Sequence, residues 1–117
     1  MNFKILKCRK IKIKHNKNKM LEFFVKIKDR LVYIIYTKAM TNAIKDMVDN
    51  DDVETTAPYI GFHLVPFEYL PNLADMTEKG YPCTIYKYED YLNEEEYKEL
   101  IKAIVNYNGE VISSKVK

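Results

Sequence analysis

Carboxylates form the densest groups of chemically capable side chains in this sequence. A first cluster comprises Asp46, Asp49, Asp51, Asp52 and Glu54. A second cluster, farther along the chain, comprises Glu89, Asp90, Glu94, Glu95, Glu96 and Glu99. Closely spaced carboxylates can ligate a hard cation or attract a basic partner. The first cluster has neither the spacing nor the glycine of an EF-hand loop, so we expect no metal site there.

The two acidic clusters instead suggest an electrostatic contact surface. A strongly negative face can occupy a basic groove that otherwise holds nucleic acid, because electrostatics dominate such binding. The chain also has ten tyrosines, whose rigid rings and polar tips suit contact surfaces. We therefore predict a partner-binding surface made of Asp46, Asp49, Asp51, Asp52, Glu54, Tyr86, Tyr88, Glu89, Asp90, Tyr91, Glu94 and Glu95. An acidic surface that serves only solubility is the alternative.

The N-terminal segment has the opposite charge. Residues 1–19 contain eight lysines and arginines and no acid, whereas residues 20–117 contain eleven against seventeen acids. We therefore divide the chain into a basic N-terminal arm or edge strand, residues 1–19, and a single acidic domain, residues 20–117. Translation from Met20, where the charge changes sign, is an alternative. As an arm, the segment could contact nucleic-acid phosphates through Lys10, Lys12, Lys14, Lys17 and Lys19.

Residues suited to catalysis are few. His63 alternates with apolar neighbours in a predicted strand, and no motif supplies a group to orient it. A small hydrolase or transferase using His63, Tyr81 or Cys83 is therefore the least supported function. The chain lacks a glycine-rich phosphate loop and the GxSxG, HExxH and CxxC patterns, and its two cysteines are too far apart in sequence for a zinc motif. We predict a protein that is not an enzyme and needs neither cofactor nor metal.

Hydrophobicity argues against a membrane segment. No apolar run approaches the roughly 18 residues that span a bilayer, and the basic N-terminus lacks the continuous apolar segment of a signal peptide. The bias toward Lys, Ile, Asn and Tyr is typical of AT-rich genomes. We expect a cytoplasmic protein, located in the host cell if it is viral.

Hydrophobic periodicity predicts the elements that position these residues. Strands are expected at 3–14, 22–27, 31–36, 60–65, 83–88 and 110–116, and helices at 39–48, 71–79 and 93–108. Residues 31–36 are apolar on both faces, which indicates a central strand. Residues 49–58 are predicted to form an acidic loop. Asn93, with Glu96 three residues later, predicts a capping box at the start of the last helix.

This order predicts an α+β or α/β fold with a mixed sheet of about five strands, an N-terminal β-hairpin and three helices. In its strand–helix alternation, small size and acidic surface the chain resembles barstar-type inhibitors in broad architecture. From the acidic, tyrosine-containing surface we expect a small non-enzymatic inhibitor that blocks the basic surface of a nuclease or effector. A phage anti-defence or immunity protein, or a DNA mimic, would act in this way. A nucleic-acid-associated protein that uses residues 1–19 is the alternative.

Overall fold

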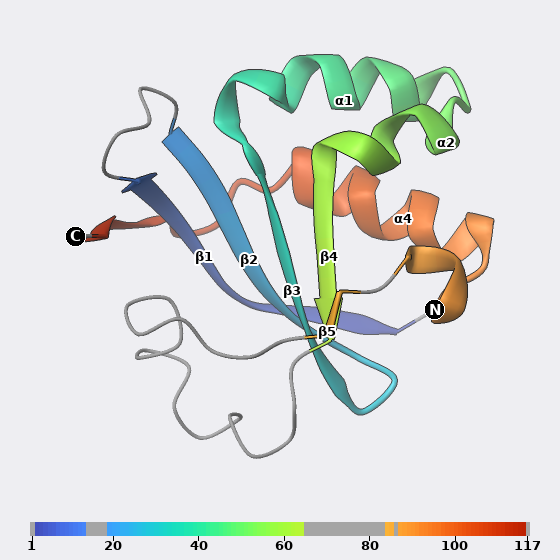
Figure 1. Ribbon diagram of the computed structural model, residues 1–117, viewed down its shortest axis with the longest axis horizontal. Coiled ribbons are helices and arrows are strands. Elements are labelled where there is room, and N and C mark those ends of the chain that lie inside the picture. Colours follow the sequence, from blue (N-terminus) through green and yellow to red (C-terminus); the bar gives the residue numbers. More distant parts are fainter. Residues whose placement is uncertain (1, 14–18, 65–83, 86, 117) are drawn as a thin grey trace.

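The computed structural model describes residues 2–13, 19–64, 84–85 and 87–116, which form one sheet with helices packed against it (Figure 1). The described strands lie in the order β5-β4-β3-β2-β1-β6. Parallel pairing joins β1 to β6, and the other neighbours are antiparallel. The strands are β1 (Phe3–Ile13), β2 (Lys19–Ile27), β3 (Arg30–Thr37), β4 (Ile60–Leu64), β5 (Thr84–Ile85) and β6 (Ile112–Val116).

The described helices lie together on one face of this sheet (Figure 1). The α-helices are α1 (Thr41–Asp49), α2 (Val53–Thr56) and α4 (Glu94–Val105), and the 3-10 helices are η1 (Lys38–Met40), η2 (Ala57–Tyr59) and η4 (Tyr88–Asp90). The core lies between the two layers, where Phe23 and Ile34 from the sheet meet Ile44 of α1 and Leu100 of α4. The α+β class expected from the sequence is confirmed, and the described sheet has six strands, not five.

The hairpin of β2 and β3 contains the two strands expected at 22–27 and 31–36. The two turn residues are Lys28 and Asp29, both with positive φ, at 50° and 63°. Such a turn matches the right-handed twist of the strands that it joins. Arg30 already belongs to β3, which lies between β2 and β4 and is buried on both faces along most of its length.

The basic N-terminal segment forms β1, an interior strand. It pairs with β2 along its length, from Phe3 opposite Ile27 to Lys12 opposite Lys19. Its second half, residues 9–13, also pairs with β6 on the other side. Cys8 is buried in the core, and burial raises the pKa of its thiol to about 11. Residues 3–13 are therefore part of the folded sheet, because β6 pairs with the edge of β1 that faces away from β2.

Helix α4 matches the prediction closely. The side chain of Asn93 accepts the backbone N–H of Glu96 at 2.8 Å, and the Glu96 carboxylate accepts the Asn93 N–H at 3.0 Å. This reciprocal pair satisfies two amides that the helix leaves unbonded. The apolar residues whose helical spacing predicts this helix are buried: Tyr97, Leu100, Ile101, Ile104 and Val105.

Other elements differ from the expectation. The predicted acidic loop, 49–58, contains α2, where burial of Val53 and Thr56 stabilises a helix too short to form alone. The predicted strand 83–88 is described only as β5, and Tyr88 begins η4. Thr37 precedes the helix expected at 39–48, and its residue type suits an N-cap, but its side chain makes no capping hydrogen bond at the start of η1. The predicted helix 71–79 lies outside the described residues.

Candidate functional site

The two acidic clusters meet at one end of the molecule. Helix α1 packs against α4, and Figure 1 shows the end of α1, α2, η4 and the start of α4 on the same side. Asp51, between α1 and α2, forms an ion pair with Lys98 of α4. The Thr56 hydroxyl lies 3.4 Å from that of Tyr97, on which the ring of Tyr88 stacks at 3.7 Å. We call this surface, residues 46–59 and 87–99, the acidic end.

The acidic end is strongly negative. Residues 46–59 contain five acids and no lysine or arginine, and residues 87–99 contain six acids and two lysines. The nine carboxylates predicted to bind a partner are all exposed: Asp46, Asp49, Asp51, Asp52, Glu54, Glu89, Asp90, Glu94 and Glu95. Their charges therefore add at one surface, which the sequence alone does not show.

Two of the tyrosines predicted to contact a partner, Tyr88 and Tyr91, are instead packed within the fold. Tyr88 is 6% exposed and belongs to the core cluster. Burial is the main cause that raises the pKa of Tyr88, and the charges of Glu89, Glu94 and Glu54 raise it further. Carboxylates from both clusters thus act on one hydroxyl, which again places them together.

Tyr91 fastens the hairpin to the start of α4. Its hydroxyl donates to the carbonyl oxygen of Ile27, and the ammonium of Lys28 lies 5.4 Å from the centre of its ring. The same ammonium contacts Glu96 at 3.2 Å. Tyr91 is therefore half-buried, and both its hydroxyl and its ring already make contacts within the fold. Tyr86 lies outside the described residues.

An exposed aromatic residue that the sequence analysis missed is Tyr59. It is 47% exposed in η2, directly after the acidic α2. A neighbouring cleft of about 440 Å³ is lined by Pro58, Tyr88 and Glu89, among others. The signal was available in the sequence, because Tyr59 lies only five residues after Glu54, the last acid of the first cluster.

His63 does not have the surroundings of a general base. Its ring lies beside that of Tyr33, at 5.8 Å between centroids, and its buried Nδ1 has no hydrogen-bond partner among the described residues. Burial lowers the pKa of His63, so the imidazole is neutral at pH 7. A general base needs an orienting group, which the described residues do not place at this nitrogen. Tyr81 and Cys83 lie outside the described residues.

A buried polar group lies on the sheet face opposite the helices. The Glu22 carboxylate, 1% exposed, accepts hydrogen bonds from Arg9 Nε at 3.3 Å and from the Tyr33 hydroxyl. Burial raises the pKa of Glu22, while the Tyr33 hydrogen bond and the Arg9 charge oppose that rise. Arg9 and Glu22 are cross-strand partners, so the ion pair joins β1 to β2.

The lysines assigned to nucleic-acid contact are distributed over the sheet. Lys10 is half-buried in β1, Lys12 lies in the same strand, and Lys19 is exposed at the start of β2. Lys14 and Lys17 lie outside the described residues. Because β1 is an interior strand, the lysines of 3–13 belong to the folded domain and not to a separate arm.

The described residues contain no group of three His, Cys, Asp or Glu side chains arranged to hold a metal ion. Among them there is also no helix long and apolar enough to cross a membrane. No protein-family model matches the chain, and the comparisons with curated proteins and with solved structures find no significant match.

Proposed function

We propose that this protein is a non-enzymatic inhibitor whose acidic end binds a basic surface of another protein. The observation that supports the proposal is the convergence of two sequence-distant acidic clusters, which the Asp51–Lys98 ion pair and the Thr56–Tyr97 contact join. Folding alone does not require this. Asp46 and Asp49 lie in the last turns of α1, where the negative end of the helix dipole disfavours acids, and the last turn contains no basic residue.

The expected partner is a nuclease or effector whose basic groove binds nucleic acid. A concentrated negative field speeds encounter with such a surface and selects against acidic partners. Tyr59, exposed beside the first cluster, supplies the aromatic anchor that charge alone does not. A phage anti-defence or immunity protein, or a DNA mimic, would use the surface in this way.

The first experiment identifies and tests the partner. Tagged full-length protein is used to capture partners from nuclease-treated host lysate, and the captured protein is purified. We expect a basic protein, recovered in near-equal amount, whose nucleic-acid binding or cleavage is inhibited in competition with DNA. Capture without inhibition, or capture of acidic proteins alone, would contradict the proposal.

The second experiment separates binding from folding. In an Asp46→Lys/Asp49→Lys variant, the new lysines interact favourably with the α1 dipole, so stability should rise by about 0.3–1 kcal/mol per site. The association rate with the partner should fall on the order of tenfold at low salt, and the difference should shrink at high salt. Glu110→Lys, at an exposed residue outside the acidic end, is the matched control. An unchanged association rate in the double variant would refute the assigned surface.

A further inference from the structure

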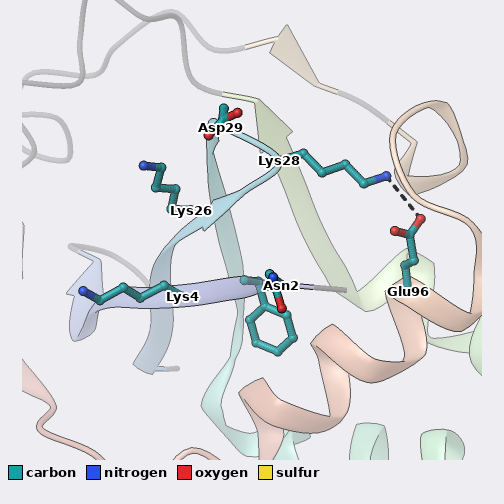
Figure 2. A pocket seen from close by; sticks show the side chains of 7 residues that line it. Asn2, Lys4, Lys26, Lys28, Asp29 and Glu96 are labelled. Carbon is teal, nitrogen blue, oxygen red and sulfur yellow. Dashed lines mark hydrogen bonds and ion pairs between the residues drawn. The ribbon is translucent and has the colours of Figure 1, made fainter.

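A cavity of about 500 Å³ lies beside the β2–β3 turn, at the start of β1. Its lining includes Phe3 and Lys4 of β1, Lys26 and Lys28 from β2 and the turn, and Glu96 of α4. In Figure 2 the side chains of Lys4 and Lys26 extend in one direction, and that of Lys28 extends in the opposite direction to pair with Glu96. The cavity thus combines strand and helix residues distinct from the predicted partner-binding residues.

Lys4 and Lys26 are direct cross-strand partners. Like charges placed directly opposite each other in an antiparallel pair destabilise a sheet. Both side chains are exposed, and in Figure 2 they extend in the same direction from neighbouring strands. Within the part of the chain that the structure describes, neither lysine has an acidic partner in an ion pair. Two positive charges are therefore held together without internal compensation.

Two acids line the cavity, the exposed Asp29 of the β2–β3 turn and Glu96 of α4, and Glu96 is already paired. Glu96 lies 3.2 Å from Lys28 Nζ and also accepts the backbone N–H of Asn93. Lys28 in turn donates to the carbonyl oxygen of Tyr91 at 3.1 Å. These contacts neutralise Lys28 and Glu96 mutually and fix that wall of the cavity. The charged lining residues that remain are Lys4, Lys26 and Asp29, so the charge left for a ligand is positive.

We propose that this cavity binds a small phosphate-bearing molecule, with Lys4 and Lys26 contacting the phosphate oxygens. A phosphate group carries up to two negative charges on a compact set of acceptors, which two adjacent ammonium groups complement. The cavity volume falls within the range of about 300–1,000 Å³ found for small-ligand sites. Phe3 adds apolar surface for the part of the ligand that carries the phosphate. Apart from Glu96, the residues of this site lie outside the acidic end, and the site does not depend on the proposed function.

The test measures binding of inorganic tripolyphosphate and of ATP to the full chain by calorimetry, together with the shift in Tm that each ligand causes. We expect Lys4→Gln and Lys26→Gln each to weaken binding on the order of tenfold, since each removes a charge-assisted contact. Without ligand, both variants should keep or raise the Tm of the parent, because each relieves the cross-strand repulsion. The control, Lys45→Gln on α1, changes an exposed lysine outside the cavity and should retain the parent affinity.

The two ligands distinguish the sources of the phosphate. Equal affinity for both assigns the site to phosphate alone, whereas tighter ATP binding that Phe3→Leu abolishes adds recognition of the base; either result supports the site. Three results would overturn it: no binding of either ligand, equal weakening by the Lys45 variant, or binding of duplex DNA in place of both small anions.

Discussion

Asp51 reaches Lys98 from a backbone position that favours glycine. Its φ is 59°, in the left-handed region, directly after the C-terminal cap of α1. Its N–H donates to the carbonyl of Val48 at 3.1 Å, and the next N–H, of Asp52, donates to Met47 at 2.8 Å. This pair of bonds is the Schellman motif, which usually has glycine at that residue. An acid thus occupies a strained position, from which it joins the two acidic clusters.

The strain at Asp51 can be measured with two substitutions. Asp51→Gly and Asp51→Ala both remove the ion pair, whose exposed partners contribute at most about 1 kcal/mol. Only glycine adopts the positive φ without penalty, so the Gly variant should be more stable than the Ala variant by about 1 kcal/mol. Urea denaturation measures the difference. Equal stabilities would show that the turn adopts another conformation in solution.

The buried Glu22 carboxyl should make stability depend on pH. Its pKa is raised in the folded protein, so the native state binds this proton more tightly than the unfolded chain does. The resulting stabilisation is complete below the ordinary value of 4.5 and is lost as pH rises through the raised value. Glu22→Gln cannot titrate. The free energy of unfolding of the parent minus that of the variant should therefore fall with rising pH in this interval.

The slope of that difference has an upper limit of about 1.4 kcal/mol per pH unit for one proton. Urea denaturation at a series of pH values gives the two curves. Glu110→Gln, at an exposed glutamate, is the control and should run parallel to the parent. A Glu22→Gln curve that also runs parallel to the parent would contradict the raised pKa.

Deletion of residues 1–19 should abolish the cooperative fold. The deletion removes β1, the strand between β2 and β6, and with it the buried side chains of Cys8, Arg9 and Ile11. We expect the dispersed amide spectrum of the full chain to collapse in the 20–117 fragment. The control variant, Lys10→Gln/Lys12→Gln/Lys19→Gln, lowers the charge but keeps the strand, and it should remain folded. A 20–117 fragment that folds would contradict this prediction and would show that residues 1–19 are an arm that the domain does not need.

Local sequence signals predicted those elements that depend on neighbours in the chain. The capping box at Asn93 and the apolar stripe of α4 are short-range features, and both are found as expected. Apolar residues on both faces of 31–36 likewise predicted a central strand, and β3 lies between β2 and β4. The nine acids assigned to partner binding from the sequence are exposed in the structure, because charged side chains stay in water unless they are paired.

The missed features depend on contacts between distant residues. Periodicity predicted β1 as extended but could not show that β6 covers its second edge. The charge pattern counted Arg9 among the arm's cations, whereas its cross-strand position opposite Glu22 buries it in an ion pair. In the same way, no local pattern indicates that Glu54 and Glu94 both lie near Tyr88.

The parallel pairing of β1 with β6 has a consequence for synthesis of the protein. Residues 9–13 leave the ribosome early, but their second hydrogen-bonding neighbour, residues 112–116, emerges about a hundred positions later. Until then β1 exposes an unpaired strand edge, the feature from which aggregation begins. Closing a loop of this length also slows folding. The lysines that alternate along β1 would protect the nascent chain during that interval, whether or not they bind anything afterwards.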